Sequence, residues 1–157
     1  MVSVKVSETK ISCSCGEVHY EITSTPLLRF ICHCTICQKF NNASFGDAII
    51  YSSSGVKDPD SSLVESSTYK PPPNVKRGKC ISCVNPVIEK LQTPLLPKLT
   101  IVPTATHHKD IKPPQPVAHL FYDQCIEQVD NSLPKYKGYL SSQLAFVRHL
   151  MSAKFKR

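Results

Sequence analysis

Short stretches in which apolar and polar residues alternate run along most of this chain. Between Glu17 and Thr23, the apolar residues Val18, Tyr20 and Ile22 alternate with polar ones. This two-residue period is typical of a strand with one buried face. Other short apolar stretches lie at residues 27–31, 45–51, 63–69, 86–91, 99–102 and 117–122. We expect each of them to be extended, and we expect one helical turn at residues 35–40.

The thirteen prolines favour a mainly β fold. They are spread from Pro26 to Pro134, and a proline inside a helix breaks its hydrogen-bond ladder. A helical bundle is therefore disfavoured, whereas many short strands with proline-rich connections are typical of an all-β domain. The prolines at 71–73 predict a stiff, extended loop that leads into residues 76–80.

The end of the chain has a different period. Apolar residues recur there at helical spacing, and either Ser141 or Ser142 can cap the start of a helix. The apolar residues are Leu140, Leu144, Val147, Met151 and Phe155. We expect one amphipathic helix that packs this face against the sheet, with contact to a protein partner or a second copy as the alternative. The predicted organisation is a body at residues 1–137 and a helical extension of the same domain at 138–157.

Length and composition are those of one ordinary domain. With 157 residues and 41% hydrophobic residues, the chain can bury a core without help from a metal. No stretch approaches the roughly 20 apolar residues that span a bilayer, and residues 1–10 lack the apolar block of a signal peptide. We expect no membrane contact and a cytoplasmic location, with the nucleus as the alternative. In such a reducing compartment, cysteines persist as thiols or metal ligands.

The net charge of +7 is concentrated near the C-terminal end. No acidic residue follows Asp130, whereas six basic residues do. They are Lys135, Lys137, Arg148, Lys154, Lys156 and Arg157. A basic stretch of this kind is usually a solvated surface, and we favour this interpretation over contact with nucleic acid.

Seven of the eight cysteines form three tight groups with the spacing of zinc ligands. The groups are Cys13/Cys15, Cys32/Cys34/Cys37 and Cys80/Cys83. Zinc in a structural site takes four ligands, and two pairs of thiolates complete a tetrahedron. Seven thiolates do not fill two such sites, so four plus three would leave one zinc ion with an open position, as catalytic zinc has. The compact triplet can hold one ion, and the two pairs can share the other.

Other interpretations of the cysteines are weaker. A disulfide framework is disfavoured without a secretion signal. A redox dithiol at Cys34 and Cys37 stays open, although the βαβ context of such motifs is missing. Cys125 has no cysteine near it in the sequence, and we interpret it as an ordinary, half-buried thiol.

Three motifs carry a family resemblance. They are CSCG at residues 13–16 followed by EVHYEI, CHCTICQKFNNASFG at residues 32–46, and the pair Cys80/Cys83 followed by Pro86; HLFYD at residues 119–123 occupies the place of a last strand. In this order they resemble the family of the glutathione-dependent formaldehyde-activating enzyme and centromere protein V, over about residues 10–137.

The resemblance implies a β-rich, Mss4-like fold and two zinc ions. One would be a structural zinc on Cys13, Cys15, Cys80 and Cys83, and the other would be held by Cys32, Cys34 and Cys37. The family's activity is carbon–sulfur lyase chemistry, in which glutathione and formaldehyde join to give S-(hydroxymethyl)glutathione.

Two departures from the family pattern concern turns. Asn42 stands where relatives usually have glycine, and asparagine tolerates a left-handed backbone, so we expect this turn to survive. Val84 replaces the glycine after the last cysteine. A β-branched residue is poorly suited to a positive φ, so we expect a reshaped turn there.

The resemblance suggests a mechanism and leaves rivals. A glutathione thiol at the open zinc position would lose its proton near neutral pH, and we favour this over carbonyl polarisation because three thiolates weaken the ion's Lewis acidity. The alternative is a non-enzymatic zinc module that contacts a protein or chromatin, as centromere protein V suggests. A lyase for another small thiol adduct is a third hypothesis.

No general acid or base is assigned from the sequence. The side chain of His33 should point away from the neighbouring ligands, and a structural hydrogen bond is as plausible for it as a functional role. We expect His119 to be a hydrogen-bonded strand histidine, and His107 and His108 to lie in a loop. Lys39 and Arg77 could attract the carboxylates of glutathione, but such residues are usually just solvated.

Overall fold

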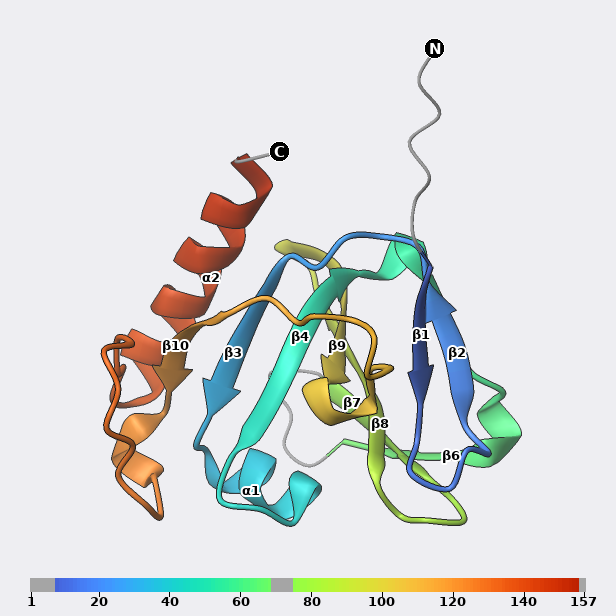
Figure 1. Cartoon of the computed structure of the whole chain (residues 1–157). Helices are drawn as coiled ribbons and strands as arrows, with labels where there is room; N and C mark the ends of the chain where they lie inside the picture. The colour runs from blue at the N-terminus through green and yellow to red at the C-terminus, as the bar shows by residue number, and fades with distance from the viewer. Residues whose placement is uncertain (1–7, 69–74, 156–157) are drawn as a thin grey trace. The chain divides into compact units, whose positions relative to one another are not determined.

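The computed structural model describes residues 8–68 and 75–155, which form two compact units. The described residues of the first unit come from Met1–Thr25 and Tyr51–Lys112, and those of the second from Pro26–Ile50 and Pro113–Arg157. The first unit is built mainly from strands, and the second combines strands with two α-helices, of which the longer lies at the C-terminal end of the chain (Figure 1). The predicted mainly β class with a C-terminal helix is confirmed.

The first unit contains a small antiparallel sheet with the strand order β1-β2-β5. Its strands are β1 (Thr9–Ser12), β2 (His19–Ile22) and β5 (Val56–Lys57). Tyr20 and Ile22 are buried and His19 is exposed, so the alternation in the sequence does mark a half-buried strand. The register pairs Ser12 with His19 and leaves the segment between them as a loop.

Four further strands of the first unit form an antiparallel ladder in chain order. They are β6 (Val64–Ser67), β7 (Val75–Cys80), β8 (Pro86–Thr93) and β9 (Leu96–Pro103). The stiff loop predicted at the prolines 71–73 lies outside the described residues, and the stretch that it was expected to lead into, residues 76–80, belongs to β7, for which the sequence predicted no strand. Its polar residues find partners across the ladder: Arg77 Nε lies 3.1 Å from Glu89 Oε2 on β8, and both side chains are nearly buried.

The second unit is centred on β3 (Leu28–Cys32) and β4 (Gly46–Ser52), which pair antiparallel. β10 (Pro116–Leu120) runs parallel to β3 on its other side. Between β3 and β4 the chain forms α1 (Thr35–Asn41), the predicted helical turn. α2 (Tyr139–Phe155) lies beside β10 and β3 (Figure 1).

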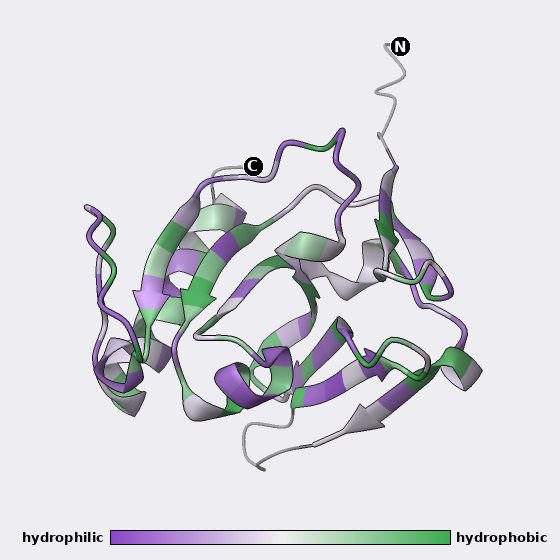
Figure 2. Cartoon of the chain, turned by 60° about the horizontal axis from the view of Figure 1, so that its bottom comes forward, coloured by the Kyte–Doolittle hydropathy of each residue, from purple (hydrophilic) through white to green (hydrophobic). Residues whose placement is uncertain are grey.

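The hydropathy of the strands follows the alternation in the sequence, and short helices connect several of the strands. Bands of hydrophobic and hydrophilic residues alternate along several strands (Figure 2). Short 3-10 helices occupy Ser53–Gly55, Ser61–Leu63, Thr104–Thr106 and Tyr122–Gln124. No helix within residues 8–68 and 75–155 has the length and apolar character that a membrane crossing needs.

The C-terminal helix exists as predicted, but it buries a different face. Leu140, Leu144, Val147 and Met151 are exposed, with 70%, 62%, 36% and 47% of their surface accessible. The side that faces the sheet carries Ser142, Ala145 and Leu150, all buried, while the ring of Phe146 meets that of Phe30 edge-on at 5.8 Å. Because Ser142 and Ala145 are small, this face of the helix can approach the strands closely, and it is the face that is buried.

The expected serine cap is also wrong. α2 begins at Tyr139, directly after Gly138 at φ 82°, and the carboxylate of Asp123 accepts a hydrogen bond from the Gly138 N–H at 2.7 Å. Ser142 lies one turn inside the helix. Its hydroxyl accepts from the N–H of Phe121 at 2.8 Å, so this serine ties the helix to the end of β10.

Candidate metal centres

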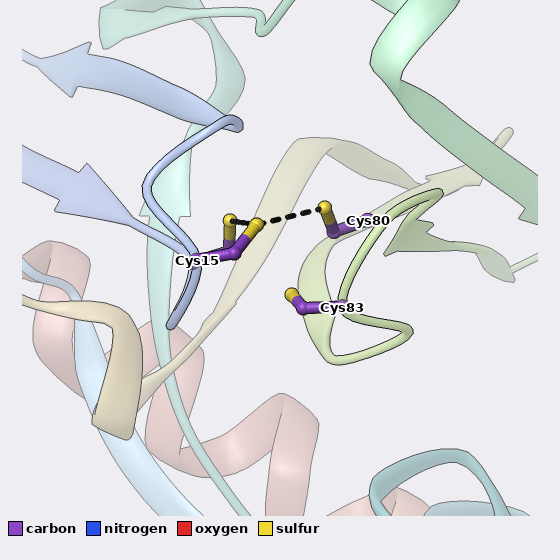
Figure 3. Close-up of side chains that lie close together, drawn as sticks. Cys15, Cys80 and Cys83 are labelled. Carbon is purple, nitrogen blue, oxygen red and sulfur yellow. Dashed lines mark hydrogen bonds between the residues drawn. The ribbon is translucent and has the colours of Figure 1, made fainter.

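Four cysteine sulfurs of the first unit converge in one cluster. Cys13 and Cys15 lie in the loop between β1 and β2, while Cys80 ends β7 and Cys83 lies in the loop before β8. All four sulfurs lie within 4.8 Å of one another. The Sγ atoms of Cys13 and Cys15 are 3.3 Å apart. Those of Cys15 and Cys80 are 3.6 Å apart, and Cys83 lies beside them (Figure 3). We call this group the four-thiol cluster.

The two loops of the four-thiol cluster are tied to each other by polar side chains. Ser82 donates a hydrogen bond to the carboxylate of Glu17, and the amide of Asn85 donates to the hydroxyl of Ser14. Each of these bonds joins the loop of one cysteine pair to the loop of the other. The chain therefore brings the pairs together with contacts that do not involve sulfur.

Each loop also orients its own cysteines through the backbone. The N–H of Gly16 donates to the carbonyl of Cys13 at 3.0 Å, and the N–H of Val18 donates to the Cys13 sulfur at 3.3 Å. In the second loop, the N–H of Val84 donates to the carbonyl of Cys80 at 2.9 Å. Backbone N–H groups that point at sulfur stabilise the thiolate, which is the form that binds metal.

Val84 corrects one expectation. Its φ is 61°, so the loop keeps the left-handed conformation in which relatives have glycine, and the turn is not reshaped. A β-branched residue at positive φ is a true outlier that costs roughly 1–3 kcal/mol. The hydrogen bonds of this loop hold the residue there. Asn42, by contrast, ends α1 at φ 46° as expected, and its N–H donates to the carbonyl of Lys39 at 3.3 Å.

Ionisation is unevenly shared within the four-thiol cluster. Desolvation opposes the charge on Cys83, but hydrogen bonds from the Asn85 backbone, the Ser14 side chain and the Cys15 backbone outweigh it and lower the pKa of Cys83 to about 6. The backbone hydrogen bond at Glu17 favours the Cys15 thiolate, but competition from the neighbouring thiols and desolvation together outweigh it and raise the pKa of Cys15 to about 12. A cation between the sulfurs removes this competition.

The second unit brings three other cysteines together. Cys32 ends β3, Cys34 is the residue that caps α1, and Cys37 lies in the first turn of that helix. Their sulfurs lie within 4.8 Å of one another, with 3.4 Å between those of Cys32 and Cys34. The Cys34 sulfur accepts the N–H of Cys37 at 3.3 Å, so the capping contact of the helix also fixes a sulfur. We call this group the three-thiol cluster.

Both clusters fit a tetrahedral ion with thiolate ligands. At about 2.3 Å per zinc–sulfur bond, two sulfurs of a tetrahedron lie about 3.8 Å apart, close to the 3.3–3.6 Å separations seen here. All-sulfur donor sets favour zinc over magnesium or calcium. The chain therefore has two cysteine clusters that could each hold a metal ion.

The two clusters differ in ligand number. Among the described residues, no histidine, carboxylate or further cysteine joins the three sulfurs of the second cluster. Cys125 is half-buried and belongs to neither cluster, as expected from its isolation in the sequence. One side of a tetrahedron on the three-thiol cluster is thus free of protein ligands.

His33 and His119 are the buried polar residues beside the three-thiol cluster. His33 is 1% exposed and His119 is 0% exposed, and their rings are bonded, with 2.9 Å between His33 Nε2 and His119 Nδ1. Burial lowers the pKa of both histidines and so favours their neutral forms. His119 is therefore the satisfied strand histidine that we expected, and His33 makes a structural hydrogen bond.

The other singled-out side chains lie in different settings. In the first unit, the His107 ring bonds the Tyr51 hydroxyl at 2.8 Å and His108 is exposed. Arg77, expected to be solvated, is instead paired with Glu89. In the second unit, Lys39 is exposed at the edge of a shallow hollow of about 510 Å³ over α1. The hollow is lined by Thr35, Gln38, Lys39, Asn42, Ala43, Ser44 and Ile126.

Sequence reasoning missed the glutamines that join α1 to the end of β10. Gln124 accepts the N–H of Thr35 through its side-chain oxygen at 2.9 Å, which satisfies a free N–H group at the start of the helix. Gln38 donates to the carbonyls of His33 at 2.6 Å and Gln124 at 2.8 Å. The two contacts with Gln124 join residues more than 80 positions apart in the sequence, so no local pattern could reveal them.

Fold and clusters together define a mainly β protein with two cysteine sites suited to zinc, one with four ligands and one with three. Comparison with protein families agrees. The model of the glutathione-dependent formaldehyde-activating enzyme family matches residues 8–124, and the chain belongs to this family. A comparison with curated proteins finds no match.

Proposed function

We propose that this chain is a zinc-dependent carbon–sulfur lyase-like enzyme that joins glutathione to formaldehyde, giving S-(hydroxymethyl)glutathione. The observation that carries the proposal is the three-thiol cluster, whose fourth tetrahedral side has no ligand among the described residues. An open position is the mark of catalytic zinc, whereas a closed set of four is the mark of structural zinc. Family membership supports the same chemistry.

The proposal gives the seven cysteines two roles. Cys32, Cys34 and Cys37 would hold the catalytic zinc, and Cys13, Cys15, Cys80 and Cys83 would hold the structural one. Zinc in the three-thiol cluster supplies positive charge that lowers the pKa of a thiol at the open position. In the reaction, the glutathione sulfur forms a bond to the formaldehyde carbon, the carbonyl π bond breaks, and the thiol proton ends on the new hydroxyl.

The remaining residues constrain how substrate is held. His33 and His119 are buried and bonded to each other, so neither imidazole meets a substrate in solution. Lys39, exposed on the rim of the hollow over α1, is placed to attract a glutathione carboxylate. Lys39 lies two residues after Cys37 on α1. We therefore propose that the peptide part of glutathione binds in this hollow.

A matched pair of cysteine variants tests the enzyme proposal. Exchange spectroscopy with isotope-labelled formaldehyde measures the rate of adduct formation above the spontaneous rate, using zinc-loaded chain and glutathione. Cys37→Ser should remove the acceleration, whereas Cys125→Ser, which changes a thiol outside both clusters, should keep it. No acceleration by the unaltered chain, or equal acceleration by Cys37→Ser, would contradict the proposal.

A second candidate function is a zinc module that binds a partner protein, and the exposed stripe on α2 favours it. Leu140, Leu144, Val147 and Met151 follow one another at gaps of four, three and four residues. This is the spacing of a and d positions in a coiled coil, and such a seam is narrower than the apolar face of a membrane-surface helix. α2 contains no acidic residue, so two copies could form no ion pairs along it. The fitting partner is an acidic amphipathic helix.

Designed helices test this second candidate. A synthetic peptide with leucine or isoleucine at a and d and glutamate at e and g should bind the chain at least ~10-fold more tightly than its lysine counterpart. Leu144→Glu should abolish that binding, and Ser152→Glu, with the same charge change on another exposed side, should not. Equal binding of both peptides, or of both variants, would overturn the assignment.

A further inference from the structure

A series of hydrogen bonds, buried at its two histidines and exposed at its outer end, links the three-thiol cluster to the loop after β10. His33, between Cys32 and Cys34, meets His119 of β10 at 2.9 Å, and the ring planes are tilted by 30°. The His119 ring continues to the side chain of the exposed Asn131, with Nε2 at 3.0 Å from Nδ2 and 3.2 Å from Oδ1. The rings of Phe45 and Tyr122 flank His33. Imidazoles as deeply buried as these two need hydrogen-bond partners to be tolerated.

The contacts of Asn131 fix which group donates and which accepts in this series of hydrogen bonds. Its Oδ1 already accepts the backbone N–H of Leu133 at 3.2 Å and the ammonium of Lys135 at 3.3 Å. Both of those groups can only donate. The Nδ2 group of Asn131 is therefore the one that donates to His119 Nε2. A neutral His119 then carries its proton on Nδ1 and donates it to His33 Nε2, so His33 must carry its own proton on Nδ1.

His33 is held at three points as a result. Its N–H donates to the carbonyl of Leu120 at 2.9 Å, its carbonyl accepts from Gln38 at 2.6 Å, and its ring accepts from His119. The residue between two of the three sulfurs thus has no freedom to rotate. Partners behind metal ligands act in this way: they orient the ligands before the ion arrives.

We propose that His119 and Asn131 are positioning residues of the three-thiol cluster, which hold His33, and with it Cys32 and Cys34, in the geometry that accepts a metal ion. The chain of donors runs from Asn131 through His119 to His33. This inference concerns the assembly of the site, and it holds whether the site acts on glutathione or only binds zinc.

The donor-to-acceptor order from Asn131 through His119 to His33 is tested first, by nitrogen NMR of the histidine rings in the zinc-loaded protein. Both His33 and His119 should be neutral and protonated at Nδ1. A proton on Nε2 of either ring would overturn the inference, because the donor chain would then run the other way or be broken.

The positioning role is tested with three variants and cobalt(II) as the probe metal. In His119→Leu the donor to His33 is lost, and the affinity of the three-thiol cluster for cobalt should fall about tenfold. This is the lower end of the ~10–100-fold loss seen when the partner of a metal ligand is removed, because His33 lies beside the ligands and is not one itself. The four-thiol cluster should be unaffected. In His119→Asn the side-chain amide can take the place of Nδ1, and most of the affinity should return. The thiolate-to-cobalt charge-transfer bands report each cluster.

Ile49→Ala is the control for general damage to the second unit. Ile49 is fully buried on β4 and belongs neither to the donor chain nor to a cysteine cluster, so its truncation destabilises the unit without touching either. It should leave cobalt affinity within about twofold of the unaltered chain once the protein is folded. If Ile49→Ala weakens cobalt binding as much as His119→Leu, or if His119→Leu has no effect, the positioning role is wrong. Failure of formaldehyde chemistry alone would leave this result unchanged, so the two proposals can be told apart.

Discussion

The two cysteine clusters reach similar sulfur spacings through different kinds of local structure. The four-thiol cluster is made by two loops at strand ends, and its ligands come from positions more than 60 residues apart, as the Cys15–Cys80 contact shows. The three-thiol cluster is made by a single strand–helix connection of six residues, Cys32 to Cys37. A metal ion in the four-thiol cluster would close a long loop of the chain, whereas one in the three-thiol cluster would close a short loop.

This difference predicts different energetic roles. A cross-link that closes a long loop constrains the unfolded chain more than one that closes a short loop. The short connection is already held by the helix cap at Cys34 and by the bonds of His33, so it needs metal less for its shape. We therefore propose that the four-thiol cluster serves stability and the three-thiol cluster serves chemistry.

The largest expected effect is that of Cys80→Ser. Cys80 is 1% exposed, and its loss breaks a zinc site whose apparent binding free energy is ~10–16 kcal/mol in comparable structural sites. We expect loss of zinc from the four-thiol cluster and unfolding of the first unit, measured by metal content and denaturant unfolding. A variant with full stability and full zinc content would refute the structural role.

The next effect is that of Cys37→Ser. It should remove about one zinc ion and leave a folded protein, because the surrounding strand pairing and the Gln124 contact to α1 do not depend on that sulfur. Metal analysis and circular dichroism measure both parts. Global unfolding of this variant would show that the three-thiol cluster also carries the fold, and the comparison would fail.

A pH effect sharpens the comparison in the metal-free, reduced protein. The pKa of Cys83 falls from its ordinary value of 9.0 to about 6, so folding favours its thiolate. That contribution is complete above pH ~9 and is lost as the pH falls through about 6. Ultraviolet thiolate absorbance should show one group titrating near pH 6, absent in Cys83→Ser. Titration of every thiol above pH 8 would contradict the geometry described for this loop.

The smallest expected effect is that of Val84→Gly. Glycine removes the cost of the left-handed conformation at φ 61° but loses some free energy through its more flexible unfolded state. We expect a net gain of up to ~1 kcal/mol in the free energy of unfolding of the zinc-loaded protein. Val84→Ala, which keeps a Cβ, should give less; a loss of stability with glycine would show that Val84 makes contacts worth more than its strain.

Much of the fold could be predicted because most strands carry their own periodic signal. The alternation around Tyr20 marks β2, and short apolar stretches mark β3, β4, β8, β9 and β10. β7 has no such signal, since it contains two lysines and Arg77. The ion pair with Glu89 makes this strand compatible with burial, and its partner lies on another strand that local reasoning cannot place.

The face of α2 shows the limit of helical periodicity. The sequence contains an apolar stripe at Leu144 and Val147, and period alone cannot say whether such a stripe meets the sheet or solvent. The side that faces the sheet instead buries the polar Ser142 and the small Ala145 together with Leu150. Close packing, which depends on the shape of both surfaces, decided the face.

The candidate sites show a similar division. The three cysteine groups are local motifs, so their grouping into sets of four and three was accessible from spacing. The contact between His33 and His119 joins residues 86 positions apart, and neither histidine has a local motif that predicts the other. The residues that support a site therefore need the structure, even where the metal ligands do not.

The most direct test of the central claim is X-ray absorption at zinc on freshly purified, reduced protein before and after glutathione is added. Two zinc ions with four and three cysteine ligands give a mean of about 3.5 sulfurs per ion. If the three-thiol cluster takes a substrate thiol, glutathione should raise this mean to about 4, and Cys37→Ser should abolish the rise. Two zinc ions whose sulfur count ignores glutathione would contradict thiol activation and favour the partner-binding module.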